Sequence, residues 1–135
     1  ASVVVVSAQV EAELVDLEDD ERQTFLEELG VVKGETGLEK LIREVYGLLK
    51  LRTYFTSGET ETKAWTIIEG MKAPQAAGVI HTDFEKAFIR AETIAYADMV
   101  ELGSEKAAKE AGKLRSEGKE YIVEEGDVLH FLHGK

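Results

Sequence analysis

The sequence predicts an α+β protein in which a small mixed sheet follows a strand–helix–helix segment. Three observations favour this fold class. Short runs of β-branched and aromatic residues recur in the second part of the chain, bounded by glycine-containing turns. A helix-like stretch interrupts these runs, and a longer apolar stripe at helical spacing precedes them. With 44% hydrophobic and 32% charged residues in a chain of 135, the composition is that of a globular protein.

The first part begins with a β-branched run, Val3–Val6, which predicts a strand buried on both faces. Ser7 and Ala8 end this run. Acidic residues at 16–21 then precede apolar residues at helical spacing, which predicts a helix from about residue 19 to residue 29. We interpret the acidic run as a solvated helix start rather than a cation site, because nothing nearby supplies a fixed cage of ligands.

A second helix begins at Thr36, because Thr36 and Glu39 have the spacing of a capping box. Its apolar stripe consists of Leu38, Leu41, Ile42, Val45, Leu48 and Leu49. One strand and two helices cannot close a core of their own at this size. We therefore expect residues 1–51 to be the carboxyl end of a larger α/β domain.

The second part predicts a hairpin first, with strands at residues 52–56 and 62–68 joined through a Ser-Gly turn. A helix then begins at Pro74, a residue that suits the first helical position, and it divides near residues 81–83. Residues 88–95 alternate and predict a third strand.

Ser104 has the right position to cap a helix that we expect over residues 105–115. Residues 121–123 and 128–132 predict two further short strands. The resulting order is β-β-α-β-α-β-β. One helix that crosses a mixed sheet of four or five strands is the β-grasp, or ubiquitin-like, plan.

The charge of −11 is unevenly distributed and helps to place a domain boundary. Residues 1–51 carry 5 basic and 12 acidic side chains, and residues 52–135 carry 11 and 15. Because the pattern also changes near Leu51, we expect two domains, 1–51 and 52–135. The acidic balance excludes a protein whose whole surface binds nucleic acid. The lack of cysteine and of a membrane-length apolar run favours a cytoplasmic protein, without a membrane partner.

One basic cluster stands out against this acidic background, and it is a candidate contact for RNA or the ribosome. It consists of Lys106, Lys109, Lys113, Arg115 and Lys119. The first three share one face of the expected helix by their spacing. A local basic face can contact RNA phosphates on an acidic protein. The alternative is a solvated face in which Glu105 and Glu110 interleave.

The search for catalytic and metal-ligating residues finds little. His81 and Asp83 could form an acid–base pair, but we favour the interpretation that they cap helix ends. His130 and His133 stand three apart on a strand and point to opposite faces, so we expect no metal site. Trp65 and its hairpin neighbours Tyr54 and Phe55 could stack on bases or belong to the core. We assign no catalytic residue.

Three runs are specific enough to indicate a family. Residues 51–58, 64–67 and 72–86 closely resemble the carboxyl-terminal TGS domain of YchF-type ATPases, which belong to the Obg-related P-loop GTPases. The match continues at residues 111–115, 118–123 and 126–128. Residues 4–8 are similar to the last strand and fifth nucleotide-binding motif of the G domain of the same family.

The resemblance implies a parent protein with a P-loop G domain upstream, a helical arm and a β-grasp TGS domain. It implies that the parent uses ATP or GTP with Mg²⁺ and associates with ribosomes and RNA. Ser7 and Ala8 would lie beside the nucleotide base. The sequence contains no Gly-Lys-Ser or Gly-Lys-Thr phosphate loop, so we expect that this chain alone binds no cofactor and hydrolyses no nucleotide.

Three functional hypotheses remain at this point. The first is a regulatory module of a YchF-type ATPase that contacts the ribosome or RNA and its own upstream G domain. The second is a free-standing β-grasp domain that binds a protein. The third is an enzyme built on His81 and Asp83. We also expect self-association where the Val3–Val6 segment and the apolar stripe at 38–49 are left uncovered.

Overall fold

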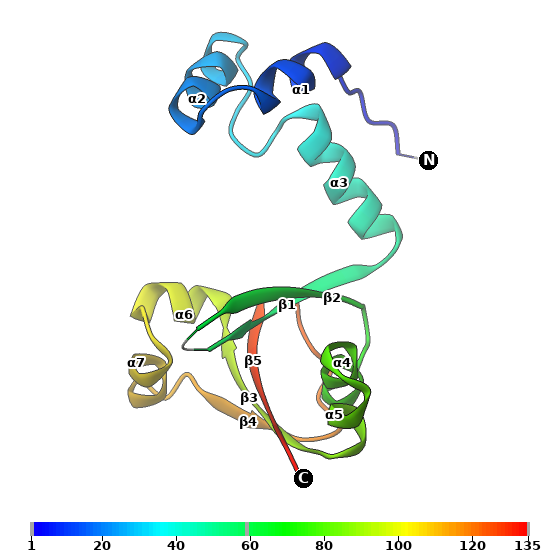
Figure 1. Cartoon of the computed structure of the whole chain (residues 1–135), viewed down its shortest axis with the longest axis vertical. Coiled ribbons are helices and arrows are strands. Elements are labelled where there is room, and N and C mark those ends of the chain that lie inside the picture. The colour runs from blue at the N-terminus through cyan, green and yellow to red at the C-terminus, as the bar shows by residue number, and fades with distance from the viewer. Residues whose placement is uncertain (1, 59, 135) are drawn as a thin grey trace. The chain divides into compact units, whose positions relative to one another are not determined.

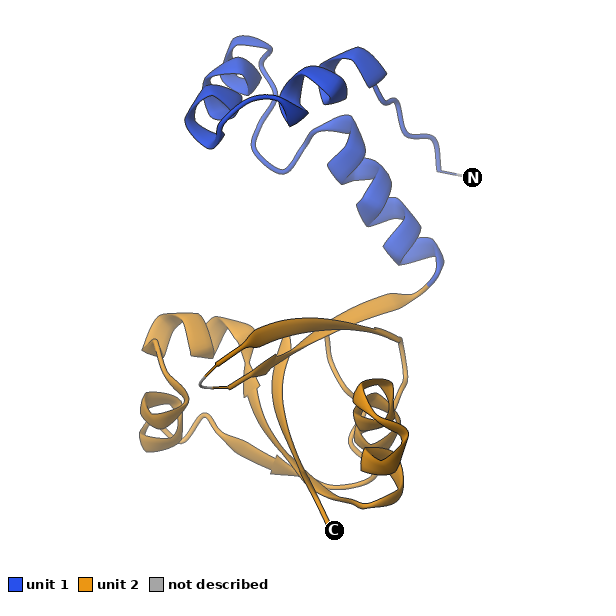
Figure 2. Ribbon diagram, in the orientation of Figure 1, with its two compact units in different colours: residues 1–49 blue, residues 50–135 orange. Residues whose placement is uncertain are grey.

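A computed structural model describes residues 2–58 and 60–134. The chain divides into two compact units, residues 1–49 and residues 50–135 (Figure 2). The first unit is helical, and the second contains a sheet and shorter helices (Figure 1). This is the mixed α+β architecture that the sequence predicts. No helix of the described part of the chain is long and apolar enough to cross a membrane.

The first unit contains three helices, α1 (Ala8–Val15), α2 (Asp19–Glu28) and α3 (Gly37–Leu48). The predictions of α2 and α3 are confirmed, whereas α1 was not predicted. Ser7 begins α1, because its hydroxyl accepts a hydrogen bond from the Val10 amide at 3.4 Å. Arg22 ties α2 to the end of α1 by donating to the carbonyls of Leu14 and Leu17 at 3.1 and 3.0 Å.

The prediction of a strand at Val3–Val6 is wrong, because residues 2–7 have no regular secondary structure. A strand must pair its backbone with a neighbour, and no strand of residues 2–58 and 60–134 lies beside this segment. The segment instead passes close to the start of α3. A Cβ atom on Gly37 would lie 2.9 Å from the Val6 Cα and 3.0 Å from the Val5 carbonyl.

The second unit contains a five-stranded sheet in the order β2-β1-β5-β3-β4. The central pair, β1 and β5, is parallel, and the other three pairs are antiparallel. The strands are β1 (Leu51–Ser57), β2 (Thr62–Ile68), β3 (Phe88–Ala95), β4 (Arg115–Glu117) and β5 (Asp127–His133). The hairpin, the third strand and the last strand are therefore confirmed.

Helices cover both faces of this sheet, with α4 and α5 opposite α6 and α7 (Figure 1). Successive residues of β1 show this arrangement, because they point to opposite faces. The Tyr54 hydroxyl donates to the Ala76 carbonyl of α4 at 2.8 Å, whereas the Phe55 ring packs at 5.6 Å from the Tyr96 ring of α6. The helices are α4 (Ala73–Ile80), α5 (Thr82–Lys86), α6 (Tyr96–Leu102) and α7 (Glu105–Glu110).

The core lies between the sheet and α4. Its buried residues come from β1, β2, β3, β5, α4 and the segment before β5: Tyr54, Ile67, Ala73, Ala76, Ala77, Phe88, Ala91, Val123, Leu129 and Phe131. Three alanines on the buried side of α4 let the helix approach the sheet closely. The alternation of these residues with exposed ones along β5 fixes its register.

Two predictions fail between β3 and β5. The helix expected over 105–115 ends at Glu110, because Gly112 adopts φ +73° and the Lys113 amide turns back to the Ala108 carbonyl at 2.8 Å. The strand expected at 121–123 is reduced to one bridge between Lys72 and Ile122. The structure adds α6 and β4, which the sequence did not predict.

Candidate functional site

The five predicted basic residues come from one continuous segment around α7 and β4. Lys106 and Lys109 lie on α7 and are exposed. Lys113 follows the helix end, Arg115 begins β4, and Lys119 lies in the turn after β4. The expected helix face that includes Lys113 does not form, because α7 has already ended. The structure therefore brings only Lys106 and Lys109 together on one helix.

Two of the five basic side chains already have acidic partners. The Lys113 ammonium lies 3.2 Å from a carboxylate oxygen of Asp98 in α6. Arg115 lies 3.5 Å from Asp127 and 3.8 Å from Glu117. Both basic groups remain about half exposed, so these contacts are modest in energy but reduce the positive charge that an external anion would meet.

Asp127 is the buried centre of the contacts around Arg115, with only 2% of its surface exposed. Its carboxylate accepts hydrogen bonds from the Tyr121 hydroxyl at 2.7 Å and from the Glu124 amide at 3.0 Å. Burial raises the pKa of Tyr121, and the hydrogen bond to Asp127 raises it further. Tyr121 therefore remains a hydroxyl donor at neutral pH, and its ring also lies beside the Arg115 guanidinium.

The other three basic side chains have no acidic partner among the residues that the structure describes. Lys106, Lys109 and Lys119 are exposed and form no ion pair with any residue in 2–58 or 60–134. Their ammonium groups are therefore accessible to a polyanion. Glu105 and Glu110 lie on the same short helix, so the local field is mixed rather than uniformly positive.

Ser7 and Ala8 lie at the start of α1 in the first unit. The Ser7 hydroxyl caps α1 by accepting from the Val10 amide. The other backbone amides of the first turn of α1 have no acceptor within the helix. A hollow of about 310 Å³ borders Ser7 within the same unit. Its walls include Val5, Val10 and Gly37.

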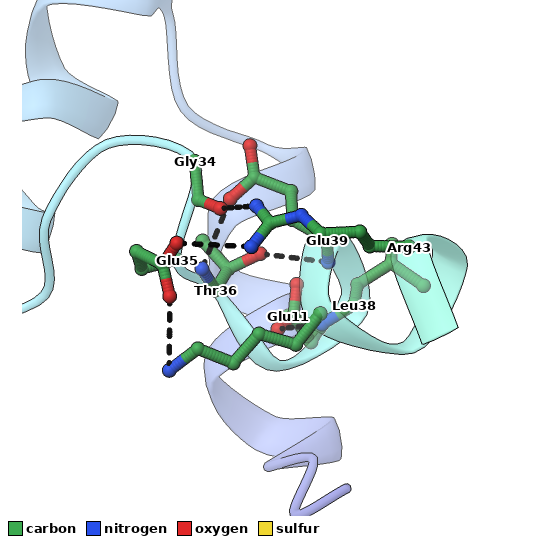
Figure 3. Close-up of polar contacts among 8 residues, drawn as sticks. Glu11, Gly34, Glu35, Thr36, Leu38, Glu39 and Arg43 are labelled. Carbon is green, nitrogen blue, oxygen red and sulfur yellow. Dashed lines mark hydrogen bonds and ion pairs between the residues drawn. The ribbon is translucent and has the colours of Figure 1, made fainter. Parts of the chain in front are cut away.

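A polar network surrounds the start of α3 (Figure 3), and two of its residues, Glu11 and Glu35, also line this hollow. The Glu11 carboxylate accepts from the Leu38 amide at 3.0 Å. Arg43 donates to the Glu35 carboxylate at 3.1 Å and to the Gly34 carbonyl at 2.7 Å. The hydrogen bond from Arg43 lowers the pKa of the Glu35 carboxyl below its ordinary value, although desolvation opposes this effect.

His81 and Asp83 form a cap rather than an organised catalytic pair. The His81 ring nitrogen Nδ1 accepts from the Asp83 amide at 3.2 Å, which begins α5. The same nitrogen lies 3.6 Å from the Asp83 carboxylate, and both side chains are well exposed. The Nδ1 atom that would pair with the Asp83 carboxylate therefore already accepts the amide hydrogen at the helix start.

The aromatic residues of the hairpin divide between the core and its edge. Tyr54 is fully buried. Trp65 is half-buried, and its indole N–H donates to the Thr56 hydroxyl at 2.9 Å, while Lys63 lies 4.3 Å from the ring centre. Tyr54 cannot stack on a base, and the Lys63 ammonium lies over the ring of Trp65.

One cluster was not indicated by sequence spacing. Glu92, Glu105 and His130 come from β3, α7 and β5, and their ligand atoms lie within 4.8 Å of one another. His133 lies elsewhere, stacked at 4.2 Å on the Phe84 ring of α5. The cluster could be found only from the strand register, which pairs Glu92 with His130. This register depends on contacts between residues that are distant in the sequence.

Comparison with known proteins decides the family. The family model described as "YchF-GTPase_C: Protein of unknown function (DUF933)" matches residues 51–134. The chain belongs to this YchF family. The resemblance seen in the sequence is thereby confirmed, and the chain is similar to curated YchF proteins over nearly its whole length.

Curated relatives carry names of ribosome-binding and Obg-like ATPases. The chain is 58% identical over 131 residues to "Ribosome-binding ATPase YchF" of Bacillus subtilis, which covers 97% of the chain and 35% of the relative. It is 57% identical to the protein of that name in Escherichia coli O157:H7, over 96% of the chain and 35% of the relative. It is 50% identical to "Obg-like ATPase 1" of Caenorhabditis elegans, over 97% of the chain and 32% of the relative.

Solved structures agree with this assignment. The structure of the Schizosaccharomyces pombe YchF GTPase matches with a TM-score of 0.83 and 42% identity, over 94% of this chain and 33% of that one. A GTP binding protein from Pyrococcus horikoshii matches at 21% identity and a TM-score of 0.51, which supports the fold alone. The chain thus spans about a third of the length of the relatives that it matches.

Proposed function

We propose that this chain is the carboxyl-terminal part of a cytoplasmic, ribosome-binding YchF-type ATPase. In this proposal residues 52–135 form a β-grasp TGS domain, and residues 1–51 complete the G domain of the parent. The sheet order with a central parallel pair, and a helix across one face, supports the β-grasp assignment. The names of the bacterial relatives support the ribosome as partner.

The observation that carries the ribosome contact is the exposure of Lys106, Lys109 and Lys119 without an acidic partner in the described part of the chain. Phosphate binding needs accessible cationic groups more than a positive net charge. Lys113 and Arg115 belong to the same proposed surface. We expect them to contribute less, because a carboxylate already lies beside each of them.

We propose that the nucleotide belongs to the parent, which uses ATP or GTP with Mg²⁺. The residues present do not form a phosphate site, because the 135 residues contain no Gly-Lys-Ser or Gly-Lys-Thr loop. Ser7 and Ala8 would contribute amides beside the base, at the start of α1. We assign no catalytic step to this chain and propose a regulatory role for the TGS domain over the G domain.

The exposed stripe of α3 supports a contact with the upstream G domain. Its six apolar residues are 40% to 83% exposed in this chain. Because burial of each large aliphatic side chain contributes about 1.5–3 kcal/mol, a folded parent would be expected to cover them. In the absence of the parent we expect this chain to self-associate through the stripe and the Val3–Val6 segment. Light scattering after size-exclusion chromatography would test this, and a monomer at high concentration would contradict it.

Ribosome co-sedimentation tests the main proposal. We expect the double variant Lys106→Gln, Lys109→Gln to weaken binding and to make it less sensitive to salt. The slope of the logarithm of the binding constant against the logarithm of the salt concentration should become shallower by about 0.7–0.9 for each lost phosphate contact. The matched control is Lys33→Gln, Lys86→Gln, which removes the same charge from exposed positions outside α7.

The two binding hypotheses give different results in this experiment. The ribosome-binding module predicts that only the α7 variant loses binding, both in the 135-residue chain and in a full-length YchF protein. A free-standing protein-interaction domain predicts no ribosome binding by any variant. Equal losses in the two double variants would show a general charge effect and would refute the α7 surface.

A further inference from the structure

Three potential metal ligands converge on the sheet face that carries α6 and α7. Glu92 of β3 and His130 of β5 are direct partners in the antiparallel register, so their side chains leave the sheet on the same side. Glu105 is the first residue of α7. One ligand atom from each residue lies within 4.8 Å of the other two. The fold therefore gathers an imidazole and two carboxylates from three separate elements.

A small hollow lies at this point of convergence, and all three side chains line it. Its volume is about 10 Å³, which is the space that one water molecule or one metal ion needs. Ser57 of β1 also lines the hollow. The remaining walls are apolar and come from β3, α6, β5 and the segment before β4: Ile94, Met99, Val128, Leu129 and Leu114. The three potential ligands thus line a space of the right size for one ion.

We propose that Glu92, Glu105 and His130 bind one divalent transition-metal ion, with Zn²⁺ as the expected occupant. Zn²⁺ accepts nitrogen and carboxylate ligands at about 2.0–2.2 Å and commonly combines three protein ligands with one water. The two carboxylates balance its charge. Imidazole disfavours Mg²⁺ and Ca²⁺, which prefer oxygen ligands, so this site is chemically separate from the magnesium of a nucleotide.

The surroundings allow the small closure that such coordination requires. Glu105 and His130 are exposed side chains, and Glu105 can rotate toward the other two ligands at little cost. Arg90 is the competing charge, because its guanidinium lies 3.5 Å from one carboxylate oxygen of Glu92. Arg90 is about half exposed, and the second oxygen of Glu92 remains for the metal.

The test is a titration of the 135-residue chain with Zn²⁺ alone, in competition with a fluorescent zinc chelator. We expect one equivalent to bind with a Kd in the micromolar range. Glu105→Gln and His130→Asn should each weaken binding at least tenfold. Two matched controls, Glu110→Gln and His133→Asn, make the same chemical changes nearby and should leave the Kd within twofold.

A second measurement uses the unaltered chain, so its result does not depend on whether the variants fold. Zn²⁺ should shift the imidazole NMR signals of His130 and leave those of His81 and His133 in place. Millimolar Mg²⁺ should not displace the Zn²⁺. The proposal is overturned if the Kd exceeds about 1 mM, if the Glu105 and Glu110 variants behave alike, or if His81 or His133 responds in place of His130.

Discussion

Removal of the Asp127 carboxylate should destabilise the second unit more than any single surface change. Asp127 is buried and accepts from the Tyr121 hydroxyl and the Glu124 amide at 2.7 and 3.0 Å. Asp127→Ala leaves both donors without this acceptor, and because these hydrogen bonds are only partly buried, each loss costs about 1 kcal/mol, the lower end of the range for unsatisfied groups. The loss of the half-exposed Arg115 contact adds only about 0–1 kcal/mol. We therefore expect the free energy of unfolding to fall by about 2–3 kcal/mol.

The assay is guanidinium unfolding of the 135-residue chain, followed by tryptophan fluorescence. Trp65 is the single tryptophan and lies in β2, so the signal reports on the second unit alone. The matched control is Asp98→Ala, which removes a carboxylate that is paired with Lys113 near the surface, and which should cost about 0–1 kcal/mol. A loss below about 1 kcal/mol for Asp127→Ala, or an equal loss in the two variants, would refute this reasoning.

Three further predictions concern other contacts. Gly37→Ala should destabilise the first unit by about 1–3 kcal/mol, because the added Cβ would clash with the backbone of Val5 and Val6. Circular dichroism at 222 nm measures this loss. The control is Gly47→Ala, whose Cβ would meet nothing within 4 Å, so this variant should be neutral or stabilising. Tyr54→Phe should cost about 1–2 kcal/mol in the Trp65 assay, since a buried carbonyl of α4 loses its donor. The pKa of the Glu35 carboxyl in the folded protein lies below its ordinary value of 4.5. Ionised Glu35 therefore stabilises the fold above pH 4.5, and this stabilisation is lost as the pH falls below 4.5. Glu35→Gln should flatten the acid-unfolding profile in that pH range.

Local signals explain the elements that the sequence predicted correctly. Thr36 and Glu39 form the capping box that their spacing indicates, at 3.2 and 2.9 Å. Pro74 lies in the first turn of α4, as its fixed φ and missing amide hydrogen would suggest. Such features depend on residues within one turn of each other, so they can be read without knowledge of the rest of the fold.

The wrong strand and the missed ion pair arise where a distant contact decides the structure. Val3–Val6 has strand propensity, but a strand also needs a partner, and the chain supplies none among the described residues. The end of α7 is a different case, because Gly112 is a local stop signal that the alanine- and lysine-rich composition outweighed in our prediction. Asp98 and Lys113 could not be paired from sequence, because the turn after Glu110 places them together.

The two proposed sites share α7, and this makes them thermodynamically dependent on each other. Glu105 precedes Lys109 by four residues, so its negative charge partly offsets the field of that lysine. A metal ion that binds Glu105 would neutralise this charge and strengthen the attraction of Lys106 and Lys109 for phosphate. By linkage, a polyanion should raise zinc affinity by the same factor as zinc raises polyanion affinity. We expect a gain of about two- to fivefold in ribosome binding when Zn²⁺ is added, and its absence in Glu105→Gln. A gain that persists in Glu105→Gln would mean that zinc acts elsewhere, and the coupling through α7 would be wrong.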